Sequence, residues 1–265
     1  MDERGPLCAG IDPHASLLAA WGLPDDVSGL ERFTMTAVEA LAGTVAAVKP
    51  QSAFFERHGS GGIAVLERAV HGCRELGAQV VLDVKRGDIG STAQAYADAY
   101  LDRSSPLAVD AITASPYLGV GSLQPMFRTA AEHGAGVFVL ALTSNPEGPQ
   151  VQHARTEDGG TVAGAVLAAL RTLNAAAESM GSFGAVVGAT VGETGEDLDI
   201  AGPLLAPGIG AQGGSAEDVR RIFGAAVVNV LPSSSREILQ AGPDVAALRA
   251  AAERAGEQFA ALVGR

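Results

Sequence analysis

Three charged residues, Asp83, Lys85 and Asp88, stand within six positions at the point where an apolar strand is predicted to end. The run from Gln79 to Val84 is aliphatic and β-branched, which is typical of a buried strand. Successive side chains of a strand point to opposite faces, so we expect Asp83 and Lys85 to share one face. Asp88 follows in a glycine-flanked turn that can bring it back towards the lysine. A satisfied ion pair at the strand end is the alternative, but structural ion pairs rarely come as groups of three charges, which favours a chemical role.

Short apolar runs alternate with helical patterns along the chain. We predict strands at Leu7–Asp12, Val45–Lys49, Gln79–Lys85, Val109–Ala114, Gly136–Leu142, Ala185–Thr190, Leu204–Gly208 and Ala226–Val230. We predict helices at Val27–Ala42, Ile63–Leu76, Thr92–Asp102, Gly121–His133, Thr161–Met180 and Ala216–Phe223. Ser91 and Gln94 have the spacing of a capping box at the start of the third helix. The apolar stripe of that helix is Ala93, Ala97, Tyr100 and Leu101.

Eight strands separated by helices predict an α/β protein, a single (β/α)8 TIM barrel over residues 1–265. A doubly wound open sheet is the alternative. It is disfavoured because it usually has fewer strands and because no G-x-G-x-x-G turn follows the first strand.

Composition narrows the functional classes. The chain is 47% hydrophobic and 18% charged, which suits one large core, and its net charge of −12 disfavours a general nucleic-acid binder. Cys8 and Cys73 do not make a disulfide framework, and we expect both to pack as small hydrophobes. The acidic N-terminus and the lack of a membrane-length apolar run lead us to expect a cytoplasmic protein that binds no membrane. The histidines, assigned surface or helix-end roles without metal-ligand spacing, are His14, His58, His71, His133 and His153.

In a barrel, functional residues gather at the carboxyl ends of the strands and in the loops that follow. The polar residues predicted there are Asp12, Lys49, Asp83, Lys85, Ser115 and Arg236. Structural roles remain open for three of them: Asp12 as a cap, Lys49 as its ion-pair partner, and Ser115 as a turn residue before Pro116. The loop 143–160 follows the fifth strand on the same face, and is either a lid or a surface excursion.

A glycine-rich stretch from Gly208 to Gly214 follows the predicted seventh strand, and Ser215 then opens a helix. Small residues such as Gly210, Gly213 and Gly214 let backbone N–H groups approach an anion. Arg236 supplies a planar cation in the next loop. Because barrels often bind phosphate after strands seven and eight, we predict a phosphate site here.

The segment from Leu82 to Thr92 resembles the D-x-K-x-x-D-I signature of the orotidine 5′-phosphate decarboxylase family. Its longer form, with Arg86-Gly87 and Thr92, resembles the type 2 branch. Further matches occur in order at Gly10-Ile11-Asp12-Pro13, Val48-Lys49-Pro50, Pro207–Gly214 and Ser234-Ser235-Arg236. Many members carry a Gly-Arg pair directly after strand eight, whereas here Pro232-Ser233-Ser234-Ser235 precedes Arg236.

The resemblance implies decarboxylation of orotidine 5′-monophosphate to uridine 5′-monophosphate without cofactor or metal, in the last step of pyrimidine nucleotide synthesis. It implies a homodimer with shared sites, in which Asp88 and Thr92 reach the neighbouring subunit's site. Lys85 would be the general acid, with Asp83 and Asp88 beside it. The implied substrate contacts are Asp12, Lys49 and Thr92 to the ribose, Ser115 to the pyrimidine, Gln212 to base and phosphate, and Arg236 to the phosphate.

Three other functions remain open. A metal-dependent decarboxylase of keto-acid sugar phosphates would need an extra acidic ligand at a neighbouring strand end, where the second strand carries Lys49. A Schiff-base aldolase needs an uncharged lysine, which two flanking carboxylates disfavour. A catalytically silent ligand-binding barrel would leave the three charged residues unused.

Overall fold

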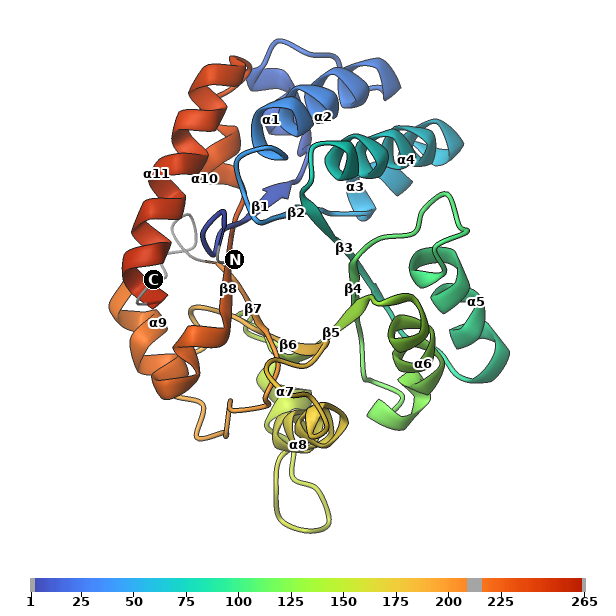
Figure 1. The fold of residues 1–265 in the computed structure, drawn as a ribbon, viewed down its shortest axis with the longest axis vertical. Helices are drawn as coiled ribbons and strands as arrows, with labels where there is room; N and C mark the ends of the chain where they lie inside the picture. The colour runs from blue at the N-terminus through green and yellow to red at the C-terminus, as the bar shows by residue number, and fades with distance from the viewer. Residues whose placement is uncertain (1–2, 209–215, 264–265) are drawn as a thin grey trace.

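Eight parallel strands form a closed barrel in the order β1 to β8, surrounded by helices (Figure 1). The computed structural model describes residues 3–208 and 216–263. The strands are β1 (Cys8–Ile11), β2 (Ala47–Pro50), β3 (Gln79–Arg86), β4 (Ala111–Ala114), β5 (Gly136–Leu142), β6 (Phe183–Val187), β7 (Leu204–Pro207) and β8 (Val230–Ser234). The predicted (β/α)8 barrel is therefore confirmed.

Most helices lie between successive strands. Those predicted are α2 (Val27–Leu41), α4 (Gly59–Glu75), α5 (Gly90–Leu101), α6 (Gln124–His133), α8 (Val162–Asn174) and α9 (Ala216–Phe223). Those not predicted are α1 (Ala15–Ala20), α3 (Ala53–Glu56), α7 (Pro149–Gln152), α10 (Arg236–Leu239) and α11 (Val245–Val263). Two 3₁₀ segments are η1 (Val120–Leu123) and η2 (Gly224–Asn229).

Strand alternation divides the core into two parts. One apolar cluster fills the inside of the barrel near the amino ends of the strands, and consists of Cys8, Ala47, Val81, Ala111, Phe138, Val186, Leu205 and Leu231. Residues one position further along, such as Val48 and Ile112, belong to the larger cluster between strands and helices. Residues two positions further along point inwards again, and these include Lys49, Asp83 and Thr113. The site is therefore built directly above a packed apolar layer.

The barrel closes where β1 lies beside β8, with Cys8 paired to Ser233 and Ala9 paired to Ser234. The prediction for β8 was wrong by four residues. The apolar run 224–229 forms the 3₁₀ segment η2, and the strand continues through Pro232 to Ser234. This shift brings the end of β8 to within two residues of Arg236.

Two helix-end predictions were also wrong. The helix α5 begins at Gly90, so Ser91 lies inside it, and Gln94 bonds to Asp98 and Thr129 instead of completing a capping box. The helix α8 ends at Asn174, six residues early. The buried Asn174 amide donates to the carbonyl oxygens of Phe183 and Ile200, at 2.8 and 3.0 Å. The side-chain stripe of α5 is buried as predicted.

Candidate active site

The carboxylate of Asp83 is the centre of a buried polar cluster. Its Oδ1 accepts from Lys85 Nζ at 2.6 Å and from the Thr113 hydroxyl at 2.7 Å. Its Oδ2 accepts from Gln51 Nε2 at 3.0 Å and from Lys49 Nζ at 3.3 Å. Asp83 and Lys85 therefore do lie on one face, and both carboxylate oxygens are saturated by donors.

Charge pairing has a larger effect than burial on the pKa values of Asp83 and Lys49. Burial acts to raise the pKa of Asp83, but Lys49 and Lys85, with hydrogen bonds from Lys85 and Thr113, hold that pKa below its usual value. Burial likewise acts to lower the pKa of Lys49, but Asp12 and Asp83 hold it above its usual value. The cluster therefore carries full charges: two ammonium groups around one carboxylate. Lys49 is ion-paired to Asp83, while Asp12 acts on it through its charge.

Lys85 has an unusual backbone. Its φ of 45° lies in the left-handed region, which costs a residue other than glycine about 1–2 kcal/mol. It lies at a bulge, because the register between β3 and β4 shifts between Leu82 and Arg86. Such strain persists where surrounding contacts determine the conformation, and it is concentrated at functional sites.

The chain just after Lys85 is fixed by Arg86. Its guanidinium pairs with Glu56, donates to the Val84 carbonyl at 3.3 Å, and lies 5.6 Å from the centre of the Tyr96 ring. Its own carbonyl accepts from Ser115 N at 2.8 Å. The next residue must be small, since a Cβ on Gly87 would lie 2.3 Å from the Ser115 carbonyl oxygen.

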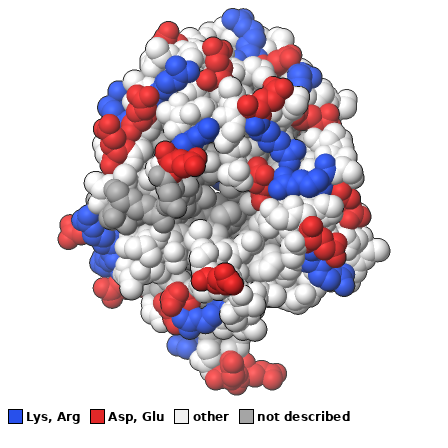
Figure 2. All heavy atoms as spheres, viewed as in Figure 1, with Lys and Arg blue, Asp and Glu red and all other residues white. Residues whose placement is uncertain are grey.

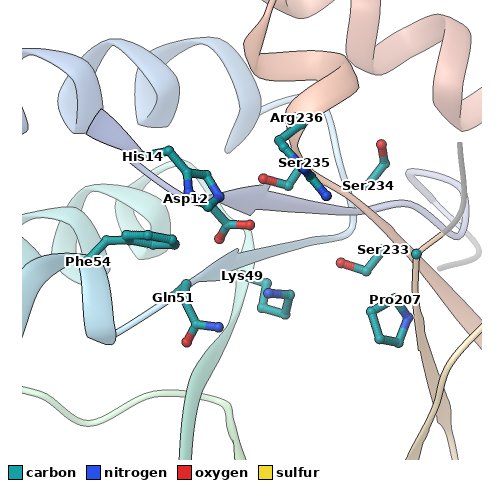
Figure 3. A pocket seen from close by; sticks show the side chains of 11 residues that line it. Asp12, His14, Lys49, Gln51, Phe54, Pro207, Ser233, Ser234, Ser235 and Arg236 are labelled. Carbon is teal, nitrogen blue, oxygen red and sulfur yellow. The ribbon is translucent and has the colours of Figure 1, made fainter. Parts of the chain in front are cut away.

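Beside the cluster lies a cavity of about 290 Å³. Figure 3 shows Asp12, Lys49 and Gln51 on one side of it and Ser233, Ser235 and Arg236 on the other. Its remaining lining residues are His14, Phe54, Pro207, Gly208 and Ser234. Such a lining of a carboxylate, hydroxyls and two cations suits a phosphorylated sugar.

Three residues that line this cavity carry a buried side-chain oxygen with no hydrogen-bond partner in the described part of the chain: Asp12 Oδ1, Ser234 Oγ and Ser235 Oγ. Buried polar atoms are normally paired, so the Asp12 and Ser235 oxygens keep bonding capacity at the edge of the cavity. Gly10 makes this arrangement possible, because a Cβ there would lie 2.6 Å from Cβ of Ser235.

The sequence matches the family described as "Orotidine 5′-phosphate decarboxylase / HUMPS family" over residues 5–251. The chain belongs to this family.

Relatives of high identity carry the first of the two names. An orotidine 5′-phosphate decarboxylase from Salinispora arenicola is 66% identical over 264 residues, covering 99% of this chain and 95% of that protein. A crystal structure described as a candidate orotidine 5′-phosphate decarboxylase, from Streptomyces avermitilis, superposes with a TM-score of 0.98 at 63% identity, covering 100% of this chain and 93% of that one. The structure of Leishmania donovani OMP decarboxylase has a TM-score of 0.75 at 32% identity, covering 99% and 96% of the two chains.

The structure brings together most of the residues that the family resemblance assigned. Asp12, Lys49 and Arg236 line the cavity, and Asp83 and Lys85 lie beside it. Ser115 lines a second cavity of about 350 Å³, between the ends of β4 and β5 and the helices α7 and α8. The positions Gln212, Gly210, Gly213 and Gly214 fall outside the described residues.

Asp88 and Thr92 do not join the cluster within this chain. Asp88 Oδ1 accepts from the Ile89 backbone N–H at 2.8 Å, and no hydrogen bond or ion pair between residues 3–208 and 216–263 links Asp88 to Lys85. Thr92 lies exposed in the first turn of α5.

Several site residues were missed by the sequence analysis. Gln51 follows Lys49 by two positions, so strand alternation beyond the predicted strand end would have indicated it. His14 does stand at a helix end, at the start of α1, but its ring also lines the cavity, 4.3 Å from the centre of the Phe54 ring. Thr113 was not indicated, because it lies within the otherwise apolar strand Ala111–Ala114.

Within residues 3–208 and 216–263, no group of three or more His, Cys, Asp or Glu residues is placed to hold a metal ion. None of the described helices is long and apolar enough to cross a membrane. Cys8 and Cys73 are buried free thiols as expected, and burial raises the pKa of each to about 12.

Proposed function

We propose that this chain converts orotidine 5′-monophosphate to uridine 5′-monophosphate and carbon dioxide. The observation that carries the proposal is the array of Lys49, Asp83 and Lys85 beside a cavity that ends at Arg236. Family membership and the 66% identical relative named for this reaction support the same conclusion. The high identity also favours the decarboxylase over the HUMPS part of the family name.

The reaction needs a cation at C6 of the pyrimidine. When the bond from C6 to the carboxylate carbon breaks, its electron pair stays on C6, where no neighbouring carbonyl delocalises it. Lys85 stabilises this charge and then transfers one ammonium proton to C6. The neutral amine regains a proton from water, which reaches it because the Lys85 side chain is 45% exposed.

Asp83 has two tasks in this mechanism. It holds Lys85 Nζ at 2.6 Å and so fixes the position of the ammonium group until the proton is transferred. Its negative charge also lies next to the departing carboxylate group. Because its four donors are fixed before the substrate arrives, little reorganisation is needed during the reaction.

The cavity supplies the binding energy. Asp12 and Lys49 bind the ribose hydroxyls, and Arg236 binds the phosphate. These contacts lie away from C6. They lower the barrier of the reaction to the extent that they are stronger in the transition state than in the bound substrate. In the same proposal Ser115 contacts the pyrimidine, and Gln212 and the glycines after β7 complete the phosphate end.

We further propose the type 2 form of the family and a homodimer with shared sites. Asp88 and Thr92 then serve the partner's site, in keeping with the exposure of Thr92 and with the lack of a bond from Asp88 to Lys85 among the described residues. Large apolar side chains are exposed on the two neighbouring loops after β3 and β4: Ile89 (62%), Tyr117 (78%) and Leu118 (53%). Apolar side chains gathered in this way are typical of a surface that a second subunit covers.

The metal-dependent sugar-phosphate decarboxylase is the other candidate. It needs an acidic ligand at the strand end next to Asp83. Here β2 places Lys49 Nζ 3.3 Å from Asp83, so a cation already occupies the space beside that carboxylate. No nucleic-acid partner is proposed, since acidic and basic side chains are interspersed over the described part of the face in Figure 2.

The test is an assay of the purified protein with orotidine 5′-monophosphate. The reaction is monitored through the loss of the substrate's absorbance and through the release of carbon dioxide. We expect turnover that is unchanged by a chelator. Absence of turnover would contradict the proposed reaction, and loss of activity on chelation would favour the metal-dependent alternative. The cytoplasmic location stays a prediction.

A further inference from the structure

The strand β4 places one hydroxyl against the bulge that carries Lys85. Between the pairs Leu82–Ile112 and Arg86–Ala114, β3 advances four residues while β4 advances two. Thr113 is the one β4 residue between these pairs, opposite the segment from Asp83 to Lys85. It points into the barrel and is 2% exposed.

A bulge takes backbone groups out of the regular ladder of hydrogen bonds. At this bulge the Lys85 N–H donates to Thr113 Oγ1 at 2.9 Å instead of to a backbone carbonyl. A hydroxyl has one proton and two lone pairs, so the same oxygen that accepts from Lys85 still has its proton to donate. It donates that proton to Asp83 Oδ1 at 2.7 Å.

The Thr113 hydroxyl therefore joins the backbone of the lysine to the carboxylate that holds its ammonium group. Asp83 Oδ1 accepts both from Thr113 Oγ1 and from Lys85 Nζ. The left-handed conformation of Lys85 and the orientation of Asp83 thus depend on one side chain. That side chain is not among those that line the cavity beside Lys49 and Arg236.

We propose that Thr113 is a positioning residue for decarboxylation, which sets the place of the Lys85 ammonium through the bulge backbone and through Asp83. The inference rests on the proposed function. It predicts that loss of the hydroxyl displaces the ammonium group from C6 while the phosphoribosyl contacts stay intact.

Thr113→Val and Thr113→Ser are a matched pair for the test, because the first removes the hydroxyl at nearly the same shape and the second keeps it. A displacement of about 1 Å costs on the order of 100-fold in rate. We expect Thr113→Val to lower kcat by on the order of 100-fold with KM close to that of the wild type. Thr113→Ser should retain kcat near the wild-type value. Thermal melting of each variant checks that it is folded.

Three results would overturn the inference: wild-type kcat in Thr113→Val, equal losses in both variants, or a change confined to KM. If Thr113→Val does not fold, the kcat values of Thr113→Ala and Thr113→Ser are compared instead. Both variants lack the methyl group, and only Thr113→Ser keeps the hydroxyl. A crystal structure of the hydroxyl-free variant gives a readout independent of turnover, and φ of Lys85 should leave the left-handed region. An inactive wild-type protein would instead contradict the proposed function.

Discussion

Asp83→Asn should destabilise the protein as well as inactivate it. The substitution keeps the shape of the side chain but removes the one negative charge between two ammonium groups. Lys49 lies 3.3 Å away with 8% of its side chain exposed, whereas Lys85 has 45% of its side chain exposed. The two ion pairs should therefore contribute very differently to stability.

The expected cost comes almost wholly from Lys49. Removing one partner of a buried ion pair costs about 3–5 kcal/mol, because the other charge stays buried without that partner. The lower end of this range applies here, since the Asp12 carboxylate still acts on the Lys49 ammonium group. A pair as exposed as that of Lys85 contributes about 0–1 kcal/mol. We therefore expect Asp83→Asn to lower the free energy of unfolding by about 3 kcal/mol at pH 7, and Lys85→Met by about 1 kcal/mol or less. For a chain of this size, 3 kcal/mol corresponds to a fall in Tm of roughly 6–12 °C.

The pH dependence has a definite sign. The pKa of Asp83 is lowered in the folded protein, so its stabilising contribution is complete above the unfolded value of about 3.9. It is lost as the pH falls through the folded value. Melting curves of wild type, Asp83→Asn and Lys85→Met should therefore be compared at pH 7 and in acid, where wild type and Asp83→Asn should converge. Equal melting of these two proteins at pH 7 would refute the reasoning.

Three further predictions concern catalysis. Lys85→Ala should lower kcat by about 100- to 1,000-fold or more while keeping the fold and product binding, and near-normal turnover would exclude it as the proton donor. Arg236→Ala should chiefly lower kcat/KM for the nucleotide and have little effect on the poor reaction of the nucleoside without phosphate; equal losses for both would show that it does not bind phosphate. Asp88→Asn and Lys85→Ala proteins should each be nearly inactive, yet mixing them under conditions of subunit exchange should restore up to about one intact site per heterodimer. Proven exchange without recovery would mean that Asp88 serves its own subunit's site or that the protein is not a dimer of this kind.

Much of the barrel could be predicted because its strands are short apolar runs. The strand β5 was predicted with the correct ends, and β3 to within one residue. The strand β8 was misplaced because two features compete there. The apolar run at 224–229 looks like a strand, while Pro232 and three serines do not. In the structure those serines form the wall of the cavity.

The charged members of the site were predictable from their position at strand ends. The neutral residues Phe54 and Thr113 were not, because they acquire their importance from the partners that the fold brings to them, whereas Gln51 lies one alternation beyond the predicted end of its strand. Thr113 is the clearest example. In sequence it is one hydroxyl within the apolar strand Ala111–Ala114, and nothing local reveals the bulge in β3 that needs its oxygen.

The closure of the barrel between β1 and β8 has a consequence for synthesis on the ribosome. Asp12 follows the first strand and Arg236 follows the last, so the two walls of the cavity come from opposite ends of the chain. A nascent chain cannot form the nucleotide site until Arg236 has left the ribosome. A nucleotide bound across this junction would then hold the first and last strands together. At 100 times its Kd it would add about 2.7 kcal/mol against opening of the barrel. We expect the cell's nucleotide pool to protect finished chains from proteolysis while leaving truncated ones unprotected.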